Sequence, residues 1–132
     1  MTVQLTEQQI KTFKTKLNDR FIALRREISE ELLSADEEQF GDLAGQVYDT
    51  GDAALADLLV DIELASIDRH IQEIRDIDAA LMRIAEGSYG ECCDCQEPIV
   101  IERLEAYPTA RRCVACQEIH DRTFAHGEQP SL

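Results

Sequence analysis

The sequence contains no tryptophan, only 5% aromatic residues, and just three prolines and six glycines in 132 residues. Neither proline nor glycine occurs between residues 2 and 40, which favours long helices and excludes collagen-like and low-complexity chains. The scarcity of aromatic side chains leaves leucine, isoleucine, valine and alanine to build the core. The length allows one domain, or a small domain with an extended arm, and excludes a large enzyme with a separate substrate domain.

Basic residues are also scarce, since 13 Lys and Arg stand against 27 Asp and Glu and give a formal net charge of −14. This charge disfavours direct binding to nucleic-acid phosphates. No apolar run approaches the roughly 20 residues that span a bilayer. The N-terminus also lacks the basic and hydrophobic segments of a secretory signal. We therefore expect a cytoplasmic protein that neither enters a membrane nor reads a nucleic-acid sequence.

Two long segments carry apolar residues at intervals of three or four, which is the period of an α-helix. The first begins at a capping box formed by Thr6 and Gln9, and the second ends at Gly87, a residue that favours helix C-caps. The first stripe comprises Ile10, Phe13, Leu17, Phe21, Leu24, Ile28, Leu32, Phe40, Leu43 and Val47. The second comprises Leu55, Leu59, Ile62, Ile67, Ile71, Ile74, Leu81 and Ile84. Turn-forming residues at 48–52 separate the two segments.

The pattern predicts a mainly α fold. We expect a long antiparallel coiled-coil hairpin over residues 1–86 with its tip at about 48–54, because narrow apolar seams and a short connection suit two paired helices. A small cysteine-bearing region with a short C-terminal helix should follow over residues 87–125, and a tail over 126–132. A compact bundle in which the first helix breaks near Ser34 and Ala35 is the alternative.

Charge is distributed unevenly along the predicted hairpin. Residues 27–68 contain 13 acidic residues and no Lys or Arg, whereas residues 11–26 contain six basic residues and one acid. The acids therefore gather on the distal arm, away from the bases at its root. This distribution is compatible with an ordinary solvated surface and with an arm that enters a cationic cavity.

Four of the five cysteines have the spacing C-x2-C-x17-C-x2-C, formed by Cys92, Cys95, Cys113 and Cys116. Two such turns supply the four soft ligands of a closed, structural zinc site. Reduced thiols or two disulfides are the alternative. Cys93 is left over as a free thiol, either a spare surface group or a redox sensor. The histidines, His70, His120 and His126, are interpreted as surface or packing residues.

The sequence resembles the DksA/TraR family of bacterial RNA polymerase-binding proteins over roughly residues 45–120. The resemblance rests on the motif from Tyr89 to Cys95, on Arg103-Leu104-Glu105-Ala106-x-Pro108-Thr109-Ala110 before Cys113, and on Asp49-x-x-Asp52-x-Ala54. It implies a zinc-bearing base and a hairpin that enters the secondary channel of RNA polymerase without contacting promoter sequence. Asp49, Asp52 and Ala54 match the family's functional tip.

The same resemblance makes binding of ppGpp doubtful. Longer family members use basic side chains for this ligand, and here Arg69 remains while the other matched positions are Asp76, Tyr107 and Gln117. The leading interpretation is a transcription regulator without catalytic activity. A transcript-cleavage cofactor of RNA polymerase and a zinc-stabilised adaptor or redox sensor unrelated to polymerase are the alternatives.

Overall fold

The computed structural model describes residues 5–34, 38–62, 64 and 66–127. Within these residues the backbone is mainly helical, with an isolated β-bridge between Glu91 and Pro98. The helices are α1 (Glu7–Ser34), α2 (Glu38–Asp49), α3 (Asp52–Leu59), α4 (Ile67–Glu86), α5 (Ile101–Ala106) and α6 (Val114–Gly127). No helix in these ranges is long and apolar enough to cross a membrane.

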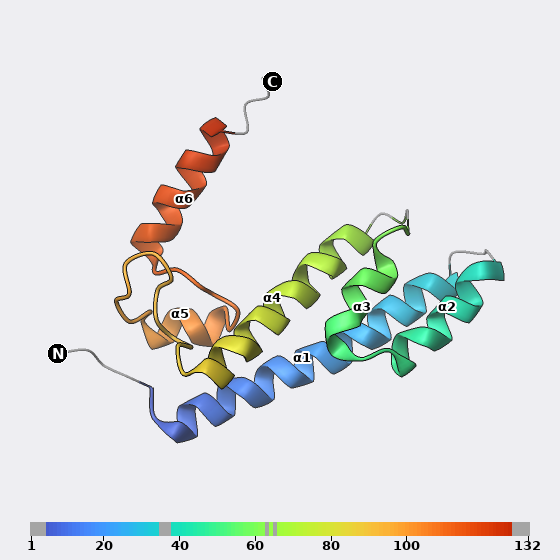
Figure 1. Ribbon diagram of the computed structural model, residues 1–132, viewed down its shortest axis with the longest axis horizontal. Helices are drawn as coiled ribbons and strands as arrows, with labels where there is room; N and C mark the ends of the chain where they lie inside the picture. Colours follow the sequence, from blue (N-terminus) through green and yellow to red (C-terminus); the bar gives the residue numbers. More distant parts are fainter. Residues whose placement is uncertain (1–4, 35–37, 63, 65, 128–132) are drawn as a thin grey trace.

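Helices α1 and α4 form the antiparallel hairpin that the sequence predicts (Figure 1). The predicted capping box is present at the start of α1, where the backbone N–H of Gln9 donates to Thr6 Oγ1 at 3.1 Å and that of Thr6 to Gln9 Oε1 at 2.8 Å. Gly87, with φ of 83°, caps the end of α4 as predicted. The buried apolar positions are Phe13, Leu17, Phe21, Leu24, Ile28 and Leu32 of α1 and Ile67, Ile71, Ile74, Ile77 and Ala80 of α4.

The first helix is shorter than predicted, since α1 ends at Ser34 and residues 38–49 form a separate helix. The last turn of α1 contains acidic Glu31 and no basic residue, and negative charge is unfavourable at a helix C-terminus. Ser34 Oγ also donates to the Glu31 carbonyl at 3.1 Å, a local bond that competes with helix continuation. The break lies where the alternative interpretation placed it, near Ser34 and Ala35, while the hairpin of α1 and α4 follows the leading one.

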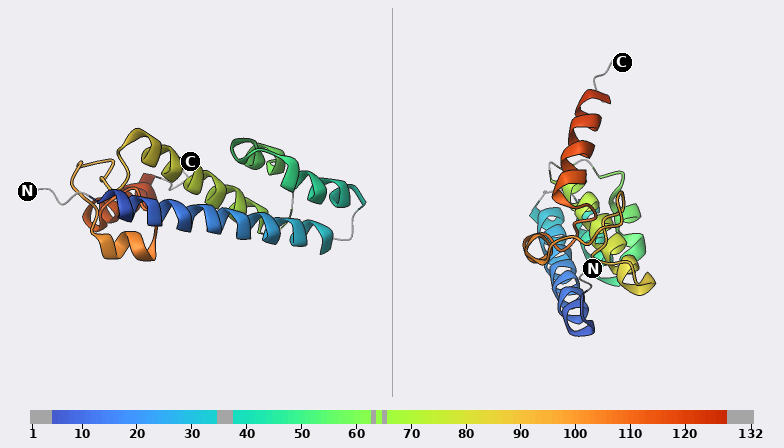
Figure 2. Two further views of the ribbon diagram at one scale, coloured as in Figure 1. Left: turned by 90° about the horizontal axis from the view of Figure 1, so that it is seen from below. Right: turned by 90° about the vertical axis from the view of Figure 1, so that its left-hand side faces the viewer.

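Helices α2 and α3 fold back toward the hairpin (Figure 2). Helix α2 lies along the distal half of α1, where the carbonyl of Ala44 accepts from Ser29 Oγ at 3.4 Å. Helix α3 packs on α4, and Asp57 forms an exposed ion pair with Arg75 at 3.9 Å. The turn predicted as the hairpin's tip therefore lies beside the middle of α1. Phe40 belongs to the predicted apolar stripe, but its side chain lies outside the described part of the chain.

The cysteine-bearing loops and α5 lie at the other end of the hairpin, and α6 projects away from them (Figure 1). Tyr89 anchors this end because its ring lies 5.7 Å from that of Phe13 and its hydroxyl donates to the Pro108 carbonyl at 2.7 Å. Burial raises the pKa of Tyr89 to about 12, so the hydroxyl stays protonated as a donor. The hairpin thus provides a fixed support for the cysteine loops.

Candidate functional site

The first cysteine pair lies in a tight loop that follows α4. The backbone N–H of Cys92 donates to the Glu97 carbonyl at 2.8 Å, and that of Gln96 returns to the Cys92 carbonyl at 2.9 Å. Gly90 precedes this loop with φ of 90°, and a Cβ there would lie 2.9 Å from Leu5 Cδ1. Glycine is therefore needed at position 90 for its backbone conformation, and a Cβ there would also displace the flexible end of the Leu5 side chain.

The second pair lies at the start of α6. The backbone N–H of Cys116 points to Cys113 Sγ at 3.5 Å, so the first turn of the helix directs a donor at a sulfur atom. A further backbone bond, from Cys93 N–H to the Arg111 carbonyl at 2.8 Å, joins the two loops. Through these bonds, the two pairs of cysteines, which lie far apart in the sequence, come together.

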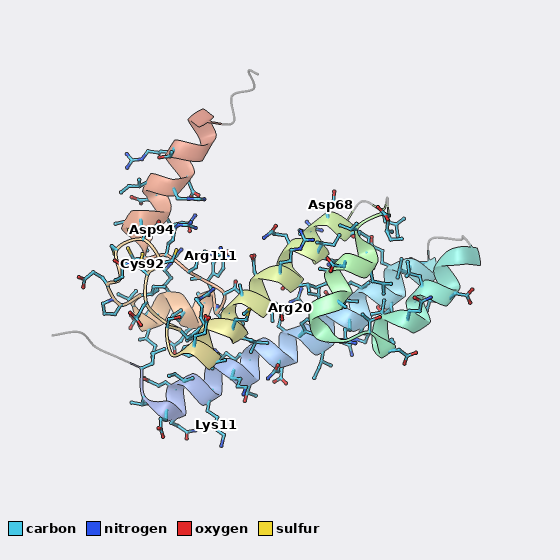
Figure 3. All side chains as sticks on the ribbon, viewed as in Figure 1. Lys11, Arg20, Asp68, Cys92, Asp94 and Arg111 are labelled. Atoms are coloured by element: carbon cyan, nitrogen blue, oxygen red, sulfur yellow. The ribbon has the colours of Figure 1, made fainter. Side chains whose placement is uncertain are left out.

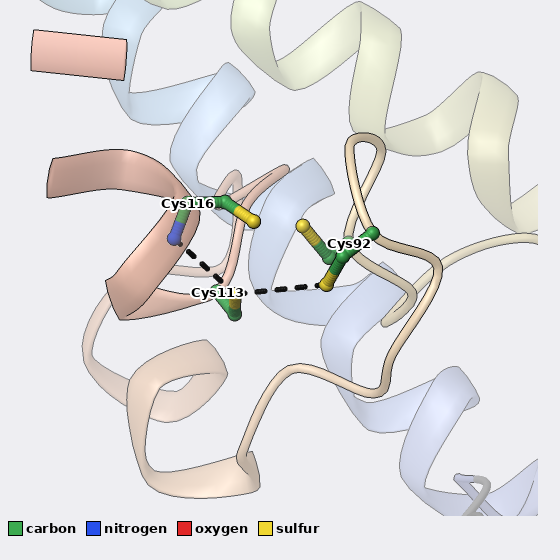
Figure 4. A group of neighbouring side chains, drawn as sticks. Cys92, Cys113 and Cys116 are labelled. Carbon is green, nitrogen blue, oxygen red and sulfur yellow. Dashed lines mark hydrogen bonds between the residues drawn. The ribbon is translucent and has the colours of Figure 1, made fainter. Parts of the chain in front are cut away.

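The four predicted cysteines form one cluster, and Figure 4 shows the three that it labels turned toward one another. Their sulfur atoms all lie within 4.8 Å of one another, and the Sγ atoms of Cys95 and Cys113 are 3.9 Å apart. Zn–S bonds of about 2.3 Å in a tetrahedron require sulfur atoms roughly 3.8 Å apart. The cluster fits a zinc ion, and four thiolates leave no open position for a catalytic water.

The thiols in this cluster differ in their tendency to ionise. Burial opposes ionisation of Cys92, but backbone N–H groups of Cys95, Cys113 and Asp94 lower its pKa to about 6. Hydrogen bonding to the Cys113 and Cys92 sulfur atoms raises the pKa of Cys116. The sulfur atoms share protons when no cation is present, and a metal ion replaces those protons.

Cys93 lies beside this cluster and outside it. Its side chain is exposed, and its Sγ lies 3.6 Å from Asp94 Oδ1. Burial raises the pKa of Cys93; the charge of Arg112 opposes this shift, and that of Asp94 reinforces it. A raised pKa disfavours the nucleophilic thiolate, so these surroundings do not favour the redox-sensor interpretation.

The acidic turn predicted from the sequence lies elsewhere, between α2 and α3. Asp49 ends α2 and is exposed, Asp52 begins α3, and Ala54 is exposed two residues later. The Asp52 side chain lies outside the part of the chain that the structure describes. Arg25 of α1 donates to the carbonyls of Val47 and Thr50, so the turn lies against α1.

A pocket of about 290 Å³ beside the cysteine loops contains the three positions that made ppGpp binding doubtful, Asp76, Tyr107 and Gln117. Arginines that the sequence interpretation did not consider also line it: Arg103, Arg111 and Arg112. They have internal partners. Arg111 lies 3.7 Å from Asp76, Arg112 Nε donates to Asp94 at 2.8 Å, and Arg103 Nε donates to the Arg112 carbonyl at 2.9 Å. The adjacent arginines before Cys113 were the available signal for this basic lining.

Comparison with known proteins connects these features. The family model described as the prokaryotic dksA/traR C4-type zinc finger matches residues 87–122. A Caulobacter vibrioides protein named RNA polymerase-binding transcription factor DksA is 38% identical over 120 residues, which cover 89% of this chain and 80% of that protein. The chain belongs to the DksA family. One structural zinc ion is accordingly the cofactor of the cysteine cluster.

Other members of the DksA family match along similar lengths. The protein of the same name from Escherichia coli strain K12 is 29% identical over 92% of this chain and 79% of its own. The structure of transcription factor DksA2 from Pseudomonas aeruginosa superimposes with a TM-score of 0.60 at 27% identity, covering 91% of this chain and 88% of that one. The DksA relationship therefore extends beyond the zinc finger to the helices.

Proposed function

We propose that this chain binds RNA polymerase and regulates transcription without catalysing a reaction of its own. The observation that carries the proposal is the match to an RNA polymerase-binding transcription factor over 89% of this chain, which includes both the helices and the cysteine loops. Cys92, Cys95, Cys113 and Cys116 are the proposed zinc ligands. The zinc ion holds the loops at the root of the hairpin and takes no part in chemistry.

The acidic turn is the proposed point of action inside the polymerase secondary channel. Carboxylates at Asp49 and Asp52 accept charge-assisted hydrogen bonds from cationic channel side chains or alter the field around a catalytic Mg²⁺ ion. The small side chain of Ala54 allows close approach. The protein regulates if it binds some promoter-complex states more tightly than others, because equal affinity shifts no population.

Competition with another secondary-channel factor tests this proposal. Zinc-loaded protein immobilised on beads should capture purified core polymerase, and excess competitor should release it. Capture that resists the competitor would place the binding site elsewhere on polymerase. Absence of capture at micromolar concentrations of both proteins would contradict the proposed function itself.

The variants Asp52→Asn and Asp49→Asn then separate binding from regulation. Removing one carboxylate charge should reduce the effect on initiation more than the affinity for polymerase, because the zinc end and the hairpin remain folded. Glu86→Gln is a matched control, since Glu86 is exposed on α4 near the opposite end of the hairpin. Equal losses of binding and regulation in the Asp52 variant would contradict a distinct regulatory role for that carboxylate.

Weak or absent synergy with ppGpp is a further part of the proposal. Asp76 pairs with Arg111 in the pocket, and Arg112 pairs with Asp94, so two of its basic groups are already neutralised. Titration of ppGpp into initiation reactions with purified polymerase should produce little change beyond its effect without this protein. Strong enhancement would contradict the expectation and show that the arginines exchange their internal partners for phosphate.

A further inference from the structure

Arg25 binds the segment that carries the acidic turn. Its guanidinium donates to the carbonyls of Val47 at 2.7 Å, Tyr48 at 3.3 Å and Thr50 at 2.8 Å. Two of these carbonyls belong to the last turn of α2, where helix geometry leaves acceptors without intrahelical partners. A side chain near the middle of α1 thus satisfies the end of another helix and fixes the position of the turn that follows it.

The surroundings of Arg25 favour this arrangement electrostatically. The C-terminal end of a helix carries partial negative charge, which attracts a guanidinium. The Arg25 guanidinium also lies 5.0 Å from the centre of the Phe21 ring, within the range of a cation–π contact. The hydrogen bonds of a charged donor are about twice as strong as neutral ones. Arg25 therefore contributes substantially to the folded-back position of α2.

Apolar contacts support the same arrangement but do not require it. Val47 of α2 and Leu55 of α3 are fully buried, and Ala44 lies against Ser29. The sequence pattern assigns Val47 and Leu55 to two stripes that also suit each other across a hairpin tip. Burial of these apolar residues therefore does not by itself fix where the turn lies, and the hydrogen bonds of Arg25 add a specific hold on it.

We propose that Arg25 is an autoinhibitory latch that holds the acidic turn, residues 49–54, against α1. The proposal rests on the proposed function, in which this turn acts inside RNA polymerase. In the latched state the turn lies beside the hairpin, and it does not form the leading end. Release of the three carbonyls frees α2 and α3 to move away from α1, and polymerase favours release because it binds the freed turn.

Hydrogen exchange of the free, zinc-loaded chain tests the latch without polymerase. In Arg25→Met, amides of residues 44–59 should exchange about tenfold faster or more, because hydrogen bonds to a charged group are lost. Amides of α4 beyond Ile71 should keep their protection. Arg26→Met is the matched control, since Arg26 is the exposed neighbour on α1. Equal exchange of residues 44–59 in the two variants would overturn the latch.

A conservative variant covers the case in which Arg25→Met unfolds the whole protein. Arg25→Lys keeps the positive charge but lacks the forked donors that bind several carbonyls. A smaller increase in exchange, again confined to residues 44–59, supports the latch. Unchanged exchange in Arg25→Lys, or an increase spread equally over α4, would show that Arg25 has no specific hold on the turn.

Polymerase binding then tests whether the latch inhibits function. Arg25→Met should bind core polymerase several-fold more tightly than wild type and act on initiation at lower concentration, while Arg26→Met should match wild type. Faster exchange combined with unchanged or weaker binding would overturn autoinhibition. If neither wild type nor variant binds polymerase, the proposed function fails, while the exchange result still decides whether Arg25 holds the turn.

Discussion

At the scale of single residues, the zinc ligands and their neighbour Cys93 offer the clearest contrast. Five cysteines lie in one region, yet only four have sulfur atoms within 4.8 Å of one another, and Cys93 is exposed outside that cluster. The C-x2-C spacing predicted this division because each such loop directs two thiols to one point. Serine substitutions at one of the four clustered cysteines and at Cys93 therefore form a matched pair.

Cys113→Ser should remove most of the bound zinc, because a hydroxyl is a poor replacement for a thiolate ligand. The variant should also lose more stability than an ordinary surface variant, since Cys113 Sγ accepts a hydrogen bond from the first turn of α6. Zinc measured by atomic emission after gel filtration should fall from one ion per chain to well below that. Cys93→Ser should retain a full zinc ion, and comparable loss from both variants would contradict the ligand assignment.

The pocket beside the cysteine loops shows what the sequence alone did not predict. Asp76, Tyr107 and Gln117, the positions matched to ppGpp contacts, predict acidic or neutral groups that would not attract this ligand. The pocket also contains Arg103 and Arg111, and the approach of Arg111 to Asp76 depends on how α4, α5 and the cysteine loops pack. Spacing along the chain does not encode that convergence.

At the scale of helices, the ion pair between Arg20 and Glu73 joins α1 to α4 (Figure 3 labels Arg20). Arg20 Nη2 donates to Glu73 Oε1 at 2.8 Å, and Arg20 Nε donates to the other carboxylate oxygen, which gives a two-pronged contact. Hydrogen bonding from Arg20 lowers the pKa of Glu73 below its ordinary value of 4.5. The pair therefore contributes stability that depends on pH.

Glu73→Gln should lower the free energy of unfolding at pH 7 by about 0.2 to 1 kcal/mol, the range for solvent-exposed ion pairs. A lowered pKa in the folded state means that the pair stabilises above pH 4.5 and that this contribution is lost as pH falls through the folded-state pKa. Urea titrations should show the difference between wild type and variant shrinking below pH 4.5. A difference that persists or grows on acidification would contradict the ion-pair explanation.

The helix boundaries separate what local chemistry determines from what packing determines. The capping box at Thr6 and the glycine cap at Gly87 were predicted correctly, because each involves residues only a few positions apart. The end of α1 at Ser34 was not the leading prediction, because the apolar stripe resumes at Phe40 and continues through Leu43 and Val47. A continuous first helix and a broken one would both bury these apolar side chains. Which of the two forms therefore depends on contacts between distant residues, such as the bond from Arg25 to the Val47 carbonyl.

At the scale of the molecule, charge is divided along the hairpin. Figure 3 shows Lys11 near the cysteine end of α1 and Asp68 near the opposite end, at the start of α4. These two residues lie as the predicted basic root and acidic arm require, but the fold-back of α2 and α3 brings the acidic turn beside Arg25 of the basic segment. An acidic end attracts a cationic cavity and raises the rate of encounter more than the final affinity.

Zinc and the latch act at opposite parts of this molecule. The cysteine cluster fixes the root through Tyr89 and Pro108, while Arg25 controls the position of the turn along α1. The zinc site and Arg25 are too far apart to share contacts. The decreases in stability caused by removing zinc and by replacing Arg25 should therefore add. The root is therefore the permanent part of the structure, and the turn is the adjustable element.

Site-specific photo-cross-linking measures most directly whether the turn enters polymerase. Tyr48 and Tyr107 are both about half exposed, at 55% and 51%, and a benzophenone amino acid replaces either with a similar shape. In complexes with core polymerase, position 48 should cross-link to residues that line the secondary channel near the catalytic Mg²⁺, and position 107 should cross-link only nearer the channel's outer rim. Full binding without any channel cross-link from position 48 would contradict the central claim.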